Sequence, residues 1–382
     1  MGMEWVKKKK PWLRLLLAGL LTVGVLADDG IVWAASPAAA NTLLNKVRIL
    51  ELPEWPVSVN RHGGHLLLSD SPEMVNSDGI TYEDTVGGQI RLFFHHVNNT
   101  NQMKKVVVVL TNDAATPAQV MIHRRGLSGQ GRENDWMYVG TKVQQRYLEN
   151  NEPELLSVPA QGATLLDVAM DQMPLGPGEL INGMYDFTSD KPVKVSVVMM
   201  PLRANALRFA ASASVLLPDE YRLRGTFDKP DRIVFPQARF ESGGLGAVAM
   251  TLADHELDKY IEGVDATDGS KVVNYGNYGV IYRIYIPPMS GNGAYVFLNP
   301  RGGTYSGYVG YSINHEPETA VPTPEYYTGA FGERPERDFA YIAQLKRGQS
   351  MWLTFSPPGA SNLPVKLVFV AAQPTLAAHQ EE

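Results

Sequence analysis

The chain has 382 residues, a formal net charge of −6 and no cysteine. An acidic surface repels nucleic acid and anionic membranes, and a chain without cysteine forms no disulfide, uses no thiol nucleophile and carries no lipid anchor on cysteine. Its 35 glycines and 26 prolines are spread along the chain, which leaves little room for long helices and favours an all-β class.

The first 34 residues have the pattern of a secretory signal peptide. Lys7–Lys10 and Arg14 form a basic head, and residues 15–27 form an apolar stretch. A membrane span needs about 20 apolar residues, which is more than this stretch contains. We therefore expect the segment to direct export and to leave no membrane span in the mature chain.

Cleavage of this signal peptide is expected after Ala34. Ala27 and Ala40 also end small-residue patterns that signal peptidase accepts, so both remain alternatives. Residues 1–34 carry five Lys/Arg and three Asp/Glu, so their removal changes the formal charge from −6 to −8. Residues 35–45 are predicted to form a flexible leader.

The rest of the chain, about 348 residues, exceeds what one hydrophobic core usually organises, so two domains are expected. In residues 46–200, short runs rich in Val, Ile, Phe and Thr alternate with turn residues, which predicts the antiparallel strands of a β-sandwich. Residues 106–110 are apolar on both faces, as in a central strand. One helix is expected after Asp135, where apolar residues recur at a spacing of four.

The strand pattern stops at residues 201–220, which predicts a linker. It resumes over residues 221–373, where Asp268-Gly269 is a plausible hairpin tip, and residues 374–382 form a tail. The predicted fold is therefore all-β, with two antiparallel β-sandwich domains of Ig-like or jelly-roll-like type and one or two short helices.

Histidines offer the first candidate site. His95 and His96 are adjacent on a predicted strand, so their side chains point to opposite faces and cannot bind one ion together. His123 would lie two strands away in a simple meander, at about 9.5 Å, so all three are interpreted as half-buried strand residues. His62 and His65 flank a Gly-Gly loop and are the better metal candidates, but no third ligand is apparent and a polar turn explains them equally. No metal or cofactor is expected.

Catalytic patterns are weak. Ser128 lies between glycines but lacks the spacing and the strand-to-helix context of a nucleophile elbow. The carboxylate pairs Asp254 with Glu256 and Glu316 with Glu318 could serve a glycoside hydrolase only if they faced each other across a cleft. The chain is therefore expected not to be an enzyme, with a hydrolase kept as an alternative.

Tyrosines supply the second candidate site, because 11 of the 17 lie between residues 275 and 341. Tyrosine on an open sheet stacks on sugar rings or packs at protein interfaces. Alternation along the strands predicts that residues 280, 282, 284 and 286 face the core. The outward-facing candidates for ligand binding are Arg283, Tyr285, Arg301 and Tyr308. The alternative is that the tyrosines are strand formers that fill a core.

Three stretches of the second half resemble parts of exported, uncharacterised proteins of Gram-positive-type bacteria: "GNYGVIYRIYIPP", "LNPRGGTYSGYV" and "SPPGASNLPVKLVF". Some of those proteins also carry a copper amine oxidase N-terminal-like stalk domain, whose repeat is absent from this sequence. The resemblance would cover residues 46–373. It implies an extracytoplasmic module, implies no amine oxidation and supplies no site residues.

Together these patterns predict a secreted or cell wall-associated module without catalytic activity. We expect it to mediate protein interaction or assembly with other envelope or extracellular proteins or with a second copy of itself. A carbohydrate-binding module that uses the exposed tyrosines of the second half, with a polysaccharide as partner, remains an alternative.

Overall fold

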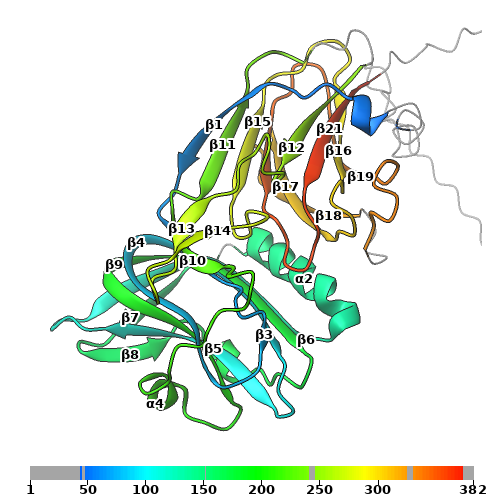
Figure 1. Cartoon of the computed structure of the whole chain (residues 1–382). Coiled ribbons are helices and arrows are strands. Elements are labelled where there is room, and N and C mark those ends of the chain that lie inside the picture. The colour runs from blue at the N-terminus through cyan, green and yellow to red at the C-terminus, as the bar shows by residue number, and fades with distance from the viewer. Residues whose placement is uncertain (1–43, 45–47, 151, 241–245, 325–329, 373–382) are drawn as a thin grey trace, which may run out of the picture. The chain divides into compact units, whose positions relative to one another are not determined.

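The computed structural model describes residues 44, 48–150, 152–240, 246–324 and 330–372 (Figure 1). They form three β-sheets and one long helix, which confirms the predicted all-β class. The predicted signal peptide and tail lie outside the described residues, as does most of the predicted leader.

The largest sheet contains eleven strands. Its main order is β14–β13–β10–β2–β4–β9–β5–β8, with β3 beside β4, β6 beside β9 and β7 beside β6. These strands are β2 (His65–Ser69), β3 (Met74–Val75), β4 (Gly79–Asn98), β5 (Lys104–Asn112), β6 (Ala118–Gly131), β7 (Glu154–Val158), β8 (Gly162–Leu165), β9 (Leu180–Pro201), β10 (Arg224–Asp228), β13 (Glu262–Val264) and β14 (Lys271–Val273).

β4 and β9 are the longest strands and pair with each other in antiparallel fashion along most of their lengths. The first half of β9 also pairs with β6 and its second half with β5, so these strands enclose an apolar core. β4 continues through an irregularity, because a register shift between Val86 and Gly88 and the left-handed φ of +75° at Gly88 accommodate it within one strand.

A second sandwich is formed by a six-stranded sheet, ordered β1–β11–β15–β20–β17–β18, and a four-stranded sheet, ordered β12–β21–β16–β19. The six strands are β1 (Val57–His62), β11 (Asp231–Pro236), β15 (Tyr282–Ile286), β17 (Gly307–Ile313), β18 (Thr319–Thr323) and β20 (Met351–Phe355). The four strands are β12 (Ala247–Leu252), β16 (Ala294–Asn299), β19 (Ala340–Leu345) and β21 (Val365–Ala371).

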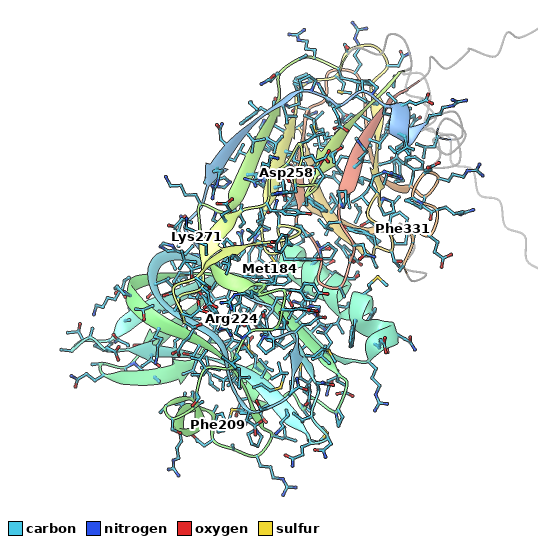
Figure 2. All side chains as sticks on the ribbon, viewed as in Figure 1. Met184, Phe209, Arg224, Asp258, Lys271 and Phe331 are labelled. Atoms are coloured by element: carbon cyan, nitrogen blue, oxygen red, sulfur yellow. The ribbon has the colours of Figure 1, made fainter. Side chains whose placement is uncertain are left out.

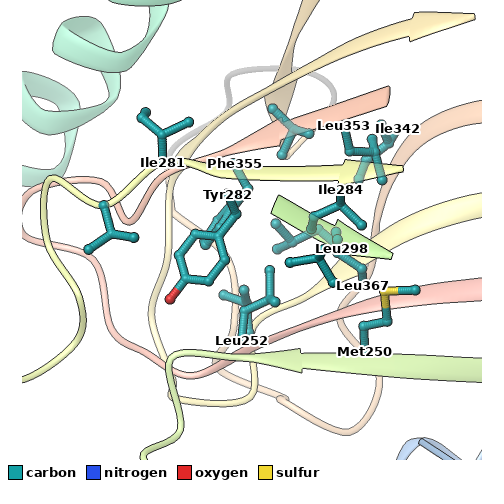
Figure 3. Close-up of a cluster of buried hydrophobic side chains, with 14 of the residues drawn as sticks. Met250, Leu252, Ile281, Tyr282, Ile284, Leu298, Ile342, Leu353, Phe355 and Leu367 are labelled. Atoms are coloured by element: carbon teal, nitrogen blue, oxygen red, sulfur yellow. The ribbon is translucent and has the colours of Figure 1, made fainter. Parts of the chain in front are cut away.

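The core of this sandwich lies between the two sheets (Figure 3). Tyr282 and Ile284 from one sheet meet Leu298 and Leu367 from the other, and all four are fully buried. Alternation placed residues 280, 282, 284 and 286 on the core side, and each of them is buried. The same apolar cluster includes Met184 of β9 (Figure 2), so it extends into the eleven-stranded sheet.

Within the described residues the chain passes between the two sandwiches four times, and two of these connections are neighbours. Gly63-Gly64 connect β1 of the six-stranded sheet to β2 of the eleven-stranded sheet, and Lys229-Pro230 lead back from β10 of the eleven-stranded sheet to β11 of the six-stranded sheet. The two connections are tied together, because the Lys229 amide donates to the Gly64 carbonyl at 2.9 Å. Strand pairing therefore crosses the linker expected at 201–220, which contains the short helix α4 (Ala206–Ala210). Long-range pairing of this kind leaves no local signal in the sequence.

The helix expected after Asp135 is α2 (Trp136–Glu149), and its buried face includes the apolar residues at a spacing of four. The Asp135 side chain makes no capping hydrogen bond. The other helices are η1 (Ile49–Glu51), η2 (Glu133–Asp135) and α3 (Val168–Asp171). No helix of the described residues is long and apolar enough to span a membrane. The predicted hairpin at Asp268-Gly269 is formed by β13 and β14.

Candidate ligand-binding site

The outer side of the six-stranded sheet, which we call the open face, faces away from the four-stranded sheet. Three aromatic side chains stand there on neighbouring strands: Phe235 on β11, Tyr285 on β15 and Trp352 on β20. We call them the aromatic row. Tyr285 is the register partner of Trp352, with ring centroids 5.0 Å apart, and Phe235 lies 6.0 Å from each. All three are only half-buried.

Charged groups border the aromatic row. The Arg283 guanidinium lies over the Trp352 ring, 5.6 Å from its centroid, and its Nη1 donates to Glu318 Oε1 at 3.2 Å and to Thr354 Oγ1 at 2.7 Å. Thr354 also donates to Glu318. The Glu318 carboxylate fits there because Gly310 has no side chain: a Cβ would lie 2.9 Å from Glu318 Oε1. Arg283 is thus held over the indole of Trp352 by its bonds to Glu318 and Thr354.

A pocket of about 420 Å³ opens where β1 ends and β11 begins, at the edge of the open face. We call it the histidine pocket, and its lining includes His62, His65, His123, Arg91, Arg124, Asp186 and Asp231. His62 on β1 is the register partner of Asp231 on β11, just as Ser58 is the partner of Phe235. Asp231 and Phe235 are four residues apart on one strand and share a face, so the pocket lies about 13 Å from the aromatic row.

The floor of the histidine pocket is a buried charge network. Arg91 binds Asp186 through two bonds, Nε to Oδ1 at 2.6 Å and Nη2 to Oδ2 at 2.8 Å, and its Nη1 donates to Asp231. Tyr147 of α2 donates to Asp186 Oδ2 at 2.7 Å. Burial alone would lower the pKa of Arg91, but the nearby Asp186, Tyr147 and Asp231 raise it well above its usual value. The guanidinium therefore stays charged.

The network also joins the two sandwiches. Arg91 and Asp186 lie on β4 and β9 of the eleven-stranded sheet, whereas Asp231 lies on β11 of the six-stranded sheet. Asp231 Oδ1 additionally accepts the backbone amide of Ile281 at 3.0 Å. The walls of the pocket are thus set by buried ionic contacts between both sheets.

The three imidazoles of the pocket have different partners. His65 Nδ1 hydrogen-bonds Asp228 Oδ1 at 2.6 Å, and His123 Nε2 hydrogen-bonds Thr188 Oγ1 at 3.0 Å. His62 Nε2 is buried and has no hydrogen-bond partner among the described residues. In the described part of the chain no three His, Asp or Glu side chains are placed to hold a metal ion. His62 and His65, the metal candidates from the sequence, thus share a pocket but not a coordination site.

The other two histidines occupy a different place. His95 and His96 lie on opposite faces of β4, as alternation predicts, but both are fully buried rather than half-buried, because strands and loops cover both faces. His96 bonds Ser69 Oγ and the Pro72 carbonyl, each at 2.9 Å. Burial lowers the pKa of His96 to about 4. These are structural side chains, and His123 lies apart from them in the histidine pocket.

The four predicted ligand-binding residues are only partly brought together. Arg283 and Tyr285 are neighbours on the open face. Tyr308 lies on the same sheet, but next to α2, where its amide donates to Gln144 Oε1 at 2.7 Å. Arg301 follows β16 of the other sheet and donates to the Pro335 carbonyl at 3.1 Å.

Phe235 and Trp352 were not among the residues predicted from the sequence. Alternation in "MWLTF" could have assigned Trp352 an outward position, whereas "RIVFP" has three consecutive apolar residues and gives no such signal for Phe235. Their proximity to Tyr285 depends on the order of strands in the sheet.

One member of each carboxylate pair suggested for hydrolysis makes structural contacts. Asp254 Oδ1 accepts the backbone amides of Glu256, Leu257 and Asp258, which closes a turn. Glu318 is bound by Arg283.

Comparison with known proteins gives no family. No family model matches the sequence, and no curated protein matches it. Among solved structures, a Paenibacillus xanthan lyase has 9% identity and a TM-score of 0.17, with 86% of this chain and 27% of the lyase covered. The CUB1-EGF-CUB2 domains of human MASP-1/3 have 9% identity and a TM-score of 0.17, with 73% and 99% covered.

A further structure is the CBM22-1-CBM22-2 tandem of Paenibacillus barcinonensis Xyn10C, with 11% identity, a TM-score of 0.11, and 84% and 94% covered. The chain spans about a quarter of the length of the xanthan lyase named above. All these TM-scores are far too low to support an argument about fold or function, so the function is argued from the site alone.

Proposed function

We propose that this chain is a secreted, non-catalytic binding module whose open face binds a glycan chain. The aromatic row is the observation that carries the proposal. A sugar ring presents C–H groups on its faces and hydroxyl groups on its rim, so it stacks on an aromatic ring while its hydroxyls hydrogen-bond to polar neighbours. The open face offers three aromatic rings and, beside them, the Arg283–Glu318 pair.

The surroundings of the row favour a glycan over a protein partner. The centre of a protein interface is a continuous apolar patch from which charged groups are depleted. Here the aromatic row is flanked on the same face by Ser58, Asn60, Ser312 and the Arg283–Glu318 pair. These polar and charged groups can hydrogen-bond to the hydroxyl groups of a sugar. The secreted location rests on the predicted signal peptide.

Affinity electrophoresis tests the proposal. The mature chain is run through native gels that contain hydroxyethylcellulose, xylan or xanthan, and is pelleted with insoluble chitin and purified peptidoglycan. We expect at least one of these glycans to retard or pellet the protein, and Trp352→Ala and Tyr285→Ala to weaken that binding. Tyr221→Ala is the matched control, because Tyr221 is 69% exposed but lies on the loop before β10.

Two results would contradict the proposal: none of the five glycans binds, or Trp352→Ala and Tyr285→Ala bind as tightly as the wild type. If the chain instead self-associates in sedimentation, and Trp352→Ala abolishes that association, the open face is a protein-assembly surface. That outcome would restore the expected role in protein interaction.

A further inference from the structure

The histidine pocket has a feature that the fold alone does not explain. His62 Nε2 is buried without a hydrogen-bond partner among the described residues. Buried polar atoms in native proteins are nearly always paired, so an unpaired one at the wall of a pocket indicates a group that arrives from outside. His123 is exposed at the same pocket, and its Nε2 hydrogen-bonds Thr188 Oγ1.

The charges of the pocket indicate which kind of ligand fits. Its two arginines are already paired, since Arg91 binds Asp186 and Asp231, and Arg124 Nη1 lies 3.4 Å from Glu318 Oε2. An anionic ligand would meet two carboxylates that share one guanidinium. The polar groups left to contact a ligand include imidazole nitrogens, which donate or accept according to tautomer, and the neutral amide of Gln89. Such a lining suits a neutral molecule rich in hydroxyl groups.

Position connects the pocket to the aromatic row. Both lie on the open face, because Asp231 and Phe235 point to the same side of β11 about four residues, or 13 Å, apart. The Arg283–Glu318 pair lies between them, and Arg124 belongs both to the pocket lining and to that pair. A linear ligand that lies across the open face can therefore contact the aromatic row and the histidine pocket at the same time.

We infer that the histidine pocket is a second sugar subsite, which receives a neutral sugar unit of the glycan whose neighbouring part stacks on the aromatic row. The inference rests on the proposed function and extends it, because it defines the ligand as a neutral oligosaccharide long enough to span both places. Two linked subsites bind a long chain more tightly than either binds a short one, since the second contact forms within the complex.

Isothermal titration calorimetry with oligosaccharides of graded length tests this inference. The probes are cello-, xylo- and chito-oligosaccharides of one to six sugars, with oligogalacturonates of the same lengths as the acidic counterpart. For the wild type we expect a rise in affinity of at least tenfold at the length that first spans both subsites. Neutral chains should bind more tightly than acidic chains of equal length.

The variants separate the two subsites. His62→Ala and His123→Ala should reduce the affinity for long oligosaccharides to that for short ones and leave short ones unchanged, whereas Trp352→Ala should weaken both. His315→Asn is the matched control: His315 is exposed outside the pocket, and asparagine tolerates its φ of +68°. His123 is exposed, so His123→Ala is expected to fold. It can therefore test the subsite alone if His62→Ala does not fold.

The outcomes distinguish the inference from the proposed function. If no oligosaccharide binds the wild type, and the polysaccharides fail as well, the proposed function is wrong. If oligosaccharides bind and Trp352→Ala weakens them, but affinity shows no length step, or both histidine variants bind long chains like the wild type, only the second subsite is refuted. Tighter binding of oligogalacturonates would overturn the neutral character of the ligand.

Discussion

Replacing Arg91 with methionine tests whether the floor of the histidine pocket holds the two sandwiches together. Arg91→Met keeps an unbranched side chain but removes the only guanidinium that binds both Asp186 and Asp231 in the described structure. Arg91 is about nine-tenths buried. Removing one partner of a buried ion pair leaves uncompensated charge and costs about 3–5 kcal/mol.

That loss is large against a total stability of about 5–15 kcal/mol. Urea unfolding followed by tryptophan fluorescence measures it: with a slope of about 3 kcal/mol/M, the midpoint should fall by about 1–1.7 M. The control is Arg48→Met, because Arg48 pairs with Glu51 at 3.0 Å while its side chain is 80% exposed. An exposed pair contributes below about 1 kcal/mol.

An equal urea midpoint for Arg91→Met and Arg48→Met would contradict this prediction. The buried network would then contribute no more than a surface pair, and the contact between the sandwiches would rest on apolar packing alone.

Three further predictions concern single positions. Trp352→Phe should weaken glycan binding less than Trp352→Ala in calorimetry, because a smaller ring still stacks. The pKa of His96 is about 4 in the folded chain, against an ordinary value of 6.5. The folded state therefore favours the neutral imidazole. About 3 kcal/mol of stability that is present above pH 6.5 is lost as the pH falls to 4. Urea unfolding of His96→Gln should lack this part of the pH dependence. Gly64→Ala should lower the melting temperature more than Gly88→Ala. The new Cβ at position 64 would lie 1.9 Å from the Gln89 carbonyl oxygen. At position 88 the Cβ meets open space, so alanine there costs only about 1 kcal/mol of stability, for the left-handed backbone.

Local patterns in the sequence predicted the all-β class and the inward and outward faces of β15. The side chains of β15 alternate with a period of two, so Tyr282 and Ile284 could be assigned to the core and Arg283 and Tyr285 to the outside. The helix α2 was predictable for the same reason, since its spacing is local. Such assignments need no knowledge of neighbouring strands.

The site itself could not be predicted, because it depends on which strands become neighbours. Phe235, Tyr285 and Trp352 are about 50 and 67 positions apart along the chain, and only the order β11–β15–β20 places them in a row. Arg301 was grouped with Tyr285 because it lies near it in the sequence, yet its strand belongs to the opposite sheet. Grouping by sequence proximity fails wherever consecutive strands alternate between sheets.

The two connections at Gly63-Gly64 and Lys229-Pro230 have a consequence for how this protein can be divided or recombined. Each sandwich takes strands from both sides of residues 201–220: β1 completes the six-stranded sheet from the front of the chain, and β10 adds to the eleven-stranded sheet from behind. A fragment cut at that segment would lack strands that it needs and retain strands without partners. We therefore expect the two sandwiches to fold together, and a fragment that ends at residues 201–220 not to fold alone.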